Sequence, residues 1–154
     1  MTVHHILVPI DFSTYAEQAL DYAIALAQKL QARLTLLHVI QPPIVASADM
    51  GVWPSSTFVD GLEAAITGDM EGYLARVTTA GLEGEIVVIH GVPFQLILDT
   101  ARARQVDLII LGTHGRTGLA HVLLGSVAEK VARLAPCPVL IARQPAPGAV
   151  AQGA

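Results

Sequence analysis

Five short apolar runs alternate with segments of helical spacing, and this alternation constrains the fold more than any other feature of the chain. The apolar runs predict strands over residues 6–10, 34–40, 85–89, 107–111 and 137–142. Between them the spacing predicts helices over 14–31 and 57–80, from Pro93 onward, and over 126–134. Alternating strands and helices form parallel sheets through right-handed crossovers. We therefore expect an α/β fold with a five-stranded parallel, doubly wound (Rossmann-like) sheet, helices on both faces and the strand order 3-2-1-4-5.

Local signals mark where three of the helices begin. Thr14-x-x-Glu17 and Ser126-x-x-Glu129 both have the form of a capping box, in which a hydroxyl and an acid satisfy backbone N–H groups. Pro93 suits the first turn of the third helix, where its missing N–H costs nothing. We expect Thr14 to cap its helix, and the Ser126 hydroxyl either to cap its helix, to contact a phosphate oxygen, or to do both.

Length and composition indicate one domain. The chain has 154 residues, of which 53% are hydrophobic and 14% charged, which suits a sheet covered on both faces. We expect the domain over residues 1–143 and a flexible tail over 144–154, which is rich in Pro, Gly and Ala. Residues 41–56 contain three prolines and predict a long loop.

Charge and hydropathy exclude several classes of partner. The net charge is −4 and no run of Lys or Arg occurs, which argues against nucleic-acid and anionic-membrane binding. No apolar run approaches the roughly 20 residues that a membrane helix needs, and no signal segment precedes the first strand. We therefore expect a cytoplasmic protein. The single cysteine, Cys137, lies in an apolar strand and is expected to be a buried hydrophobic residue, not a nucleophile.

The doubly wound fold predicts where a ligand binds. In such sheets ligands lie beyond the carboxyl ends of the strands, where the strand order changes direction. In this sequence those ends are residues 9–11, 39–41, 90–92 and 112 onward.

The fourth predicted strand runs into a glycine-rich stretch with the pattern Gly-x2-Gly-x9-Gly-Ser. Gly112, Gly115 and Gly118 permit positive φ and let a ligand approach the backbone, whose amides can converge on an anion. Gly125 and Ser126 then open a helix, and a helix N-terminus offers unpaired N–H groups to a phosphate. The strand before and the helix after these glycines favour a phosphate site over a simple turn.

Other features of this stretch leave alternatives open. Arg116, its only cation, either offsets phosphate charge or lies solvated in the loop. His114 either contacts a phosphate or fixes the loop through the backbone, and we favour the second. His121 is expected on the surface of a helical turn over 119–124. Because neither Gly-x-x-x-x-Gly-Lys-Ser/Thr nor an early Gly-x-Gly-x-x-Gly occurs, a P-loop is excluded and a dinucleotide fold is unsupported.

The pattern formed by Gly112, Gly115, Gly125 and Ser126 resembles the ATP-binding signature of the universal stress protein family. Segments that resemble the family occur in order at 6–13, 37–39, 91–93, 107–115 and 136–140. The resemblance covers about residues 3–143 and implies an ATP-binding protein that acts in stress response as a nucleotide-dependent regulatory module.

The resemblance also implies a binding site. Its residues are Pro9, Ile10, Asp11, Val39, Leu111, Gly112, His114, Gly115, Arg116, Gly125, Ser126 and Val127. By analogy Pro9 and Asp11 border the nucleoside, with the Asp11 carboxylate accepting from ribose hydroxyls. Val39 packs near adenine and offers backbone hydrogen bonds, while the glycine stretch surrounds the phosphates. Ala128 stands where some ATP-binding members have a hydroxyl residue, which implies weaker phosphate binding.

The residue types allow other roles for Asp11, and they favour structural roles for two histidines near strand ends. Asp11 can instead cap the next turn or bind a metal through the phosphates, and only the resemblance favours ribose recognition. His38 and His90 show no ligand spacing with a cysteine or an acid, which favours a satisfied or half-buried histidine at each position.

Four hypotheses about function remain. We favour a module that binds ATP, with Mg²⁺ held through the phosphates. An unidentified regulatory protein partner would recognise the ATP-bound state. The alternative is a slow ATPase or phosphotransferase, which needs a base and charge stabilisation near the γ-phosphate, and no catalytic residue is assigned. A nucleotide-free interaction protein is disfavoured by the glycines, and a flavin carrier is a more distant alternative. The resemblance implies a homodimer through the last strand, Val139–Ala142, because an edge strand can pair with a copy of itself.

Overall fold

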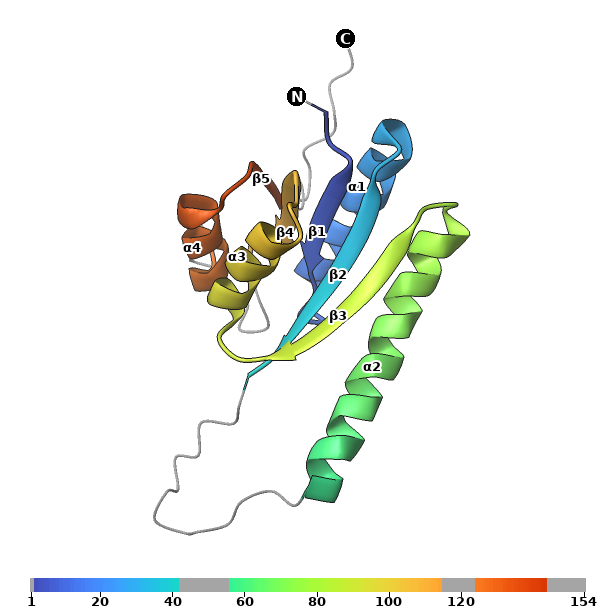
Figure 1. The fold of residues 1–154 in the computed structure, drawn as a ribbon, viewed down its shortest axis with the longest axis vertical. Helices are drawn as coiled ribbons and strands as arrows, with labels where there is room; N and C mark the ends of the chain where they lie inside the picture. Colours follow the sequence, from blue (N-terminus) through green and yellow to red (C-terminus); the bar gives the residue numbers. More distant parts are fainter. Residues whose placement is uncertain (1, 42–55, 115–123, 144–154) are drawn as a thin grey trace, which may run out of the picture.

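The computed structural model describes residues 2–41, 56–114 and 124–143 (Figure 1). The strands are β1 (His5–Pro9), β2 (Arg33–Ile40), β3 (Gly84–His90), β4 (Leu108–Gly112) and β5 (Val139–Ala142). The helices are α1 (Thr14–Leu30), α2 (Ser56–Thr79), α3 (Pro93–Ala103) and α4 (Ser126–Leu134). The predicted alternation is confirmed. The tail and nearly all of the loop predicted over 41–56 lie outside the described residues.

The sheet has the order β3-β2-β1-β4-β5, and every neighbouring pair is parallel, as predicted. From β1 the chain moves outward through β2 to β3 and then returns to place β4 on the other side of β1. The strand order therefore changes direction between β1 and β4. In a doubly wound sheet this is the place where the carboxyl ends leave room for a ligand.

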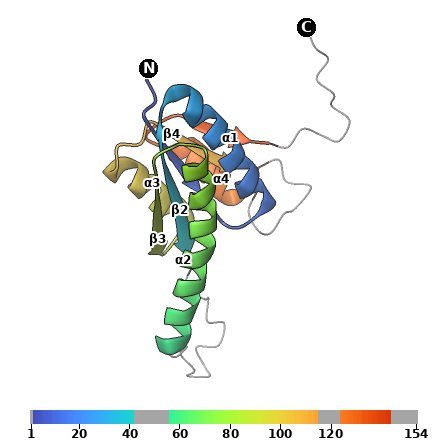
Figure 2. The ribbon, with the colours of Figure 1, turned by 90° about the vertical axis from the view of Figure 1, so that its right-hand side faces the viewer.

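Alternation along the strands gives the sheet two apolar faces. Ile6 and Val8 of β1 pack with α1 and α2 on one face, whereas Leu7 packs with α3 and α4 on the other. Met70 and Val77 of α2 are completely buried against the first face. The two layers are visible in Figures 1 and 2. Helices on both faces explain the high hydrophobic content of the sequence.

Ser13, and not Thr14, caps α1. The Ser13 hydroxyl oxygen accepts from the Ala16 N–H at 3.2 Å, and Ser13 has the extended backbone of an N-cap residue. Glu17 does not complete a capping box, because its carboxylate accepts instead from the Tyr73 hydroxyl of α2 at 3.1 Å. The capping box predicted from Thr14 is therefore wrong by one residue.

Helix α2 is long enough to extend past the sheet. Its first turns project beyond the carboxyl ends of β2 and β3 (Figures 1 and 2). Its later turns are tied to α1 by the Tyr73–Glu17 hydrogen bond and by an ion pair between Arg76 and Asp21. The projecting part of α2 is thus placed beside the region where a ligand is expected.

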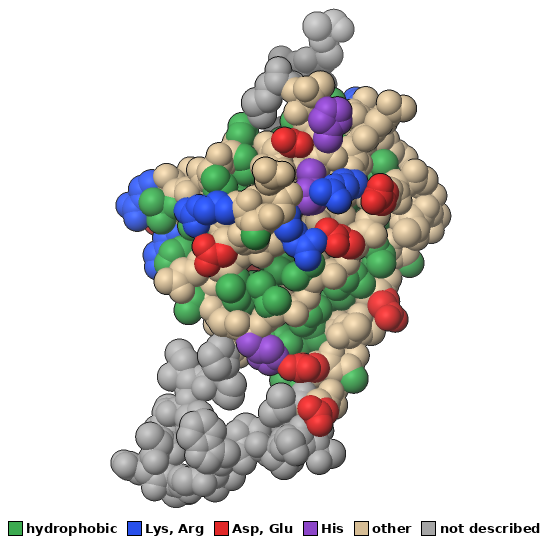
Figure 3. Space-filling model, in the orientation of Figure 1, with side chains coloured by type: hydrophobic (Ala, Val, Ile, Leu, Met, Phe, Trp, Pro, Cys, Tyr) green, Lys and Arg blue, Asp and Glu red, His purple; other side chains and the backbone are tan. Residues whose placement is uncertain are grey.

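A chain of polar contacts joins the amino-terminal halves of the strands. His5 Nε2 lies 2.7 Å from the Thr35 hydroxyl, which donates at 2.8 Å to Glu85, and Glu85 also pairs with Arg104 after α3. Because the Thr35 proton goes to Glu85, the Thr35 oxygen accepts from His5 Nε2–H. His5 Nδ1 lies 3.2 Å from Arg33 Nη2 and also 3.2 Å from the Arg104 carbonyl oxygen. In the neutral ring Nδ1 accepts from Arg33, whereas a hydrogen bond to the Arg104 carbonyl would need a proton on Nδ1. Basic and acidic side chains gather on this face above a hydrophobic patch (Figure 3).

The environment of His5 lowers the pKa of its imidazole. Burial is the main cause, and the Arg33 guanidinium adds to it. For Glu85, burial raises the carboxyl pKa, but the hydrogen bonds from Arg104 and Thr35 outweigh this and hold the pKa below its usual value. Burial and the Arg33 charge outweigh the Arg104 carbonyl contact, so the surroundings favour neutral His5, and they favour ionised Glu85.

We expect the protein to lose stability as pH falls below about 6.5, the usual pKa of histidine in an unfolded chain. The unfolded state then takes up a proton that folded His5 does not, so the free energy of unfolding falls by up to about 1.4 kcal/mol per pH unit. Urea unfolding of wild type and His5→Gln at pH 7 and pH 5.5 measures this effect. The variant should show a smaller pH dependence, and equal dependence in the two proteins would contradict the account.

Candidate functional site

A cleft of about 640 Å³ lies at the carboxyl ends of β1, β2 and β4. Segments from seven elements or their flanking loops line it: residues 9–12, 37–41, 111–112, 114 and 125–128, together with Ala16 of α1 and positions on α2 and α3. The cleft thus occupies the predicted position, where the strand order changes direction.

The structure brings ten of the twelve candidate binding residues together in this cleft. They are Pro9, Ile10, Asp11, Val39, Leu111, Gly112, His114, Gly125, Ser126 and Val127. The other two, Gly115 and Arg116, lie outside the described residues, as do Gly118 and His121.

Gly112 is required by packing and not by a positive φ. Gly112 is absent from the positive-φ glycines of the described chain, so this part of the prediction is wrong. A Cβ on Gly112 would lie 2.7 Å from the carbonyl carbon and oxygen of Tyr15, in the first turn of α1. The glycine therefore lets α1 approach the end of β4, at the edge of the cleft.

Helix α4 begins at the cleft without a side-chain cap. Gly125 is its N-cap residue, with φ −68° and ψ 153°, and Ser126 is the first helical residue, so the capping box predicted from Ser126 is wrong. The Gly125 N–H donates to the Thr113 carbonyl at 2.7 Å, which fixes the helix start against the end of β4. The first N–H groups of a helix have no intrahelical partner, and here the residues that carry them line the cleft.

Asp11 holds the turn between β1 and α1. Its Oδ1 accepts from the Ser13 N–H at 3.0 Å and from the Ser13 hydroxyl at 2.5 Å. Phe12, between them, has φ 64°, in the left-handed region that such turns use. The turn-capping role left open by the sequence is therefore present, and it places the carboxylate at the cleft wall.

The two histidines differ in burial, and each has a partner. His38 is 5% exposed, and its Nδ1 lies 2.7 Å from the Ile10 carbonyl oxygen. His90 is exposed at the end of β3 and pairs with Glu63 of α2. The prediction of satisfied histidines is confirmed at both positions.

An apolar wall of the cleft was missed by the sequence analysis. Leu62 and Ile66 of α2 line it together with Asp69, and α3 contributes Pro93 and Ile97. The spacing of 62, 66 and 69 puts the α2 residues on one helix face, which is the signal that was available. Ile66 packs on the face of the sheet covered by α1 and α2, whereas Ile97 packs on the other face together with Ala128 of α4. Apolar side chains from both faces therefore border the cleft.

Two further residues, His114 and Ala128, line the cleft near the glycine-rich stretch, where the sequence predicts the phosphates. The His114 ring lies 5.2 Å from the Tyr15 ring, and its Nδ1 lies 3.0 Å from the Thr113 hydroxyl. Ala128 is 4% exposed and belongs to the apolar core under α4, although it also borders the cleft. Ala128 therefore packs in the core between α4 and the sheet.

The family model of the universal stress proteins matches residues 2–143. The chain belongs to the universal stress protein family. Universal stress protein YxiE of Bacillus subtilis is 34% identical over 143 residues, which cover 89% of this chain and 97% of the relative.

Solved structures of the family share the fold of this universal stress protein. MJ0577 of Methanocaldococcus jannaschii has a TM-score of 0.78 at 31% identity, covering 94% of this chain and 99% of its own. A universal stress protein in complex with cAMP has a TM-score of 0.69 at 25% identity, covering 92% and 97%. The fold and the family are thus established together.

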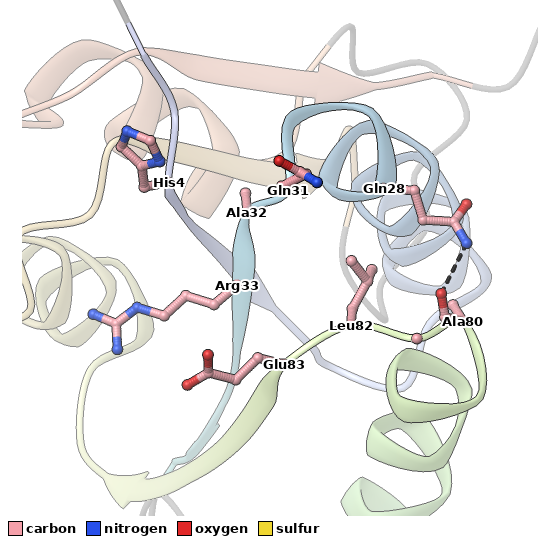
Figure 4. Close-up of a pocket in the computed structure, with 9 residues that line it drawn as sticks. His4, Gln28, Gln31, Ala32, Arg33, Ala80, Leu82 and Glu83 are labelled. Carbon is pink, nitrogen blue, oxygen red and sulfur yellow. Dashed lines mark hydrogen bonds between the residues drawn. The ribbon is translucent and has the colours of Figure 1, made fainter.

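A second hollow, of about 560 Å³, lies at the opposite end of the sheet of this universal stress protein. Its residues come from the ends of α1 and α2 and the starts of β2 and β3, where Gln28 Nε2 donates to the Ala80 carbonyl at 3.0 Å (Figure 4). Helices end here, so no helix N-terminus faces this hollow. The cleft at the carboxyl ends is therefore the better candidate site.

Three other observations bear on the chemistry available to this universal stress protein. In the described part of the chain, no three His, Cys, Asp or Glu side chains form a metal-ligand group. No described helix has the length and hydropathy of a bilayer crossing. Cys137 is half-buried just before β5, and burial raises the pKa of its thiol, which disfavours the nucleophilic thiolate.

Proposed function

We propose that this universal stress protein binds ATP in the cleft at the carboxyl ends of its strands and acts as a nucleotide-dependent regulatory module. One observation carries the proposal. The cleft offers two kinds of surface, namely apolar side chains from α2, α3 and β2, and the uncapped N-terminus of α4. A nucleotide has the same division into an apolar base and an anionic phosphate group.

The nucleoside is assigned to the β1–β2 side. Val39, Ile66 and Ile97 provide apolar surface for adenine, and the Asp11 carboxylate accepts from the ribose hydroxyls. A relative at 25% identity is in complex with cAMP, which has the same base and sugar. This supports adenine recognition as the property that the cleft shares with its relatives.

The phosphates are assigned to Gly112, Gly125, Ser126 and Val127, and by the family signature also to Gly115 and Arg116. The backbone N–H groups at the start of α4 supply donors and partial positive charge. Ser126 is exposed at the first helical position, so its hydroxyl can reach a phosphate oxygen. Mg²⁺ would be held through the phosphates, because the described cleft supplies only the carboxylates of Asp11 and Asp69.

Binding is proposed in preference to catalysis. Hydrolysis needs a positioned base and cationic stabilisation of the γ-phosphate. The described residues that line the cleft include no Lys or Arg, and Asp11 is already engaged with Ser13. We propose at most slow hydrolysis, in a cytoplasmic protein that forms a homodimer through the edge strand β5.

Gently purified protein is expected to release an adenine nucleotide, and the emptied protein is expected to bind ATP. Mass spectrometry of the released small molecules identifies the ligand, and calorimetric titration with ATP, AMP and GTP measures affinity and base preference. Phosphate release from bound ATP, followed over hours, measures hydrolysis. Absence of released nucleotide together with no heat on titration would contradict the proposal.

A further inference from the structure

Pairing between β1 and β2 ends before β2 itself ends. The last register pair joins Pro9 to Leu37, and the Ile10 N–H then donates to the Leu37 carbonyl at 2.8 Å. Alternate residues of a strand direct their N–H and C=O groups to the same neighbour. The N–H and C=O of Val39 therefore point to the side where the β1 ladder has stopped.

In a continued parallel ladder, the Val39 N–H would donate to the Ile10 carbonyl. The His38 side chain takes that carbonyl instead, with Nδ1 2.7 Å from the Ile10 oxygen. Because a carbonyl oxygen only accepts, Nδ1 carries the proton. The backbone contacts of the described residues contain no Val39–Ile10 hydrogen bond.

The surroundings of His38 fix its ring in this position. His38 is 5% exposed, and the Phe12 ring lies against it at a centroid distance of 4.6 Å. Phe12 has the left-handed backbone at which the chain turns away from the sheet. The imidazole therefore packs against Phe12 and reaches the Ile10 carbonyl at the end of β1.

We propose that His38 is a positioning residue of the nucleotide site, which separates β1 from β2 by replacing a ladder hydrogen bond with a side-chain one. The separation leaves the Val39 N–H directed into the cleft, where it can donate to an adenine nitrogen. The His38 side chain also holds the carbonyl group of Ile10 in place, and Ile10 directly precedes Asp11. The ligand part of this inference rests on the proposed function, whereas the backbone part does not.

Amide hydrogen exchange in the nucleotide-free protein tests the backbone part. In the wild type, the Val39 amide should exchange at least about 100-fold faster than the Leu37 amide, which lies inside the ladder with β1. In His38→Ala the Ile10 carbonyl is released, the ladder can close by one bond, and the Val39 amide should become protected. Equal protection of both amides in the wild type, or unchanged Val39 exchange in the variant, would overturn the inference.

Affinity for AMP and ATP, measured by calorimetry, tests the ligand part. His38→Ala should bind both at least about tenfold more weakly. His38→Asn should restore most of the affinity, because its amide nitrogen takes nearly the position of Nδ1. His38→Gln places its nitrogen near Nε2 instead and should behave like the alanine variant. Full affinity in the Ala and Gln variants, or no rescue by Asn, would overturn the inference.

A second histidine provides the matched control. His90 also stands at a strand end but pairs with Glu63 outside the cleft, so His90→Ala should change neither Val39 exchange nor affinity. If His38→Ala does not fold, the Asn and Gln variants carry the comparison. If the wild type binds no nucleotide, the proposed function fails, while the exchange result still decides the role of His38.

Discussion

Replacement of Gly112 by alanine is expected to destabilise the fold by about 3 kcal/mol, at the upper end for overpacked positions. The new Cβ would lie 2.7 Å from backbone atoms of Tyr15, and backbone cannot move aside as a flexible side chain can. Helix α1 packs on β1, β4 and β5, so it cannot retreat without loss of core contacts. For a chain of this length the melting temperature should fall by roughly 10 °C, which thermal unfolding by circular dichroism measures.

Gly72→Ala is the matched control. Gly72 lies exposed on α2, and a Cβ there meets nothing within 4 Å, so alanine should stabilise the helix by about 0.5–1 kcal/mol. If Gly112 instead served only the approach of a ligand, Gly112→Ala would keep its melting temperature and lose affinity alone. That result would refute the packing explanation.

Replacement of Asp11 by alanine is expected to weaken ATP and AMP by similar factors of about tenfold or more. The proposed contact is to the ribose, which both ligands share, and a hydrogen bond to a charged group contributes about 1.5–3 kcal/mol. Calorimetric titration of both nucleotides measures the effect. Selective loss of ATP would indicate a metal bound through the phosphates, and no loss for either nucleotide would remove Asp11 from the site.

Two variants separate the proposed ribose contact from the turn that Asp11 also holds. Asp11→Asn keeps an oxygen for the Ser13 N–H but loses the charge, so it should fold normally and still bind both nucleotides weakly. Ser13→Ala removes the cap of α1, which costs about 1 kcal/mol of stability, but leaves the Asp11 carboxylate in place. Its affinity should remain near that of the wild type.

The sequence predicted the fold well because the pattern of apolar runs directly encodes it. Strands buried on both faces read as continuous apolar runs, and their alternation with helices leaves one common topology. The fold then brings the strand ends together, which is why ten candidate residues meet in one cleft. These results depend on local periodicity and on general rules of topology.

The sequence failed where a tertiary contact decides a residue's role. Thr14 and Ser126 fit the capping pattern, but Ser13 and Gly125 take the cap positions. Gly112 fits the pattern of a ligand-facing glycine and lines the cleft, but the contact with the backbone of Tyr15 that also requires a glycine there was not predictable from the sequence. The role of His38 depends on where β1 stops pairing with β2, which no single-segment pattern records.

The polar chain from His5 through Thr35 and Glu85 to Arg104 lies at the opposite end of the strands from the cleft. Strand cohesion and the proposed ligand contacts thus lie at opposite ends of the sheet, and β1 and β2 take part in both. We therefore expect substitutions at the partly buried Val39 and the exposed Gln41 to change ligand preference while this polar chain keeps the strands in register. The preferred ligand can therefore change during evolution while the contacts that hold the strands together stay the same.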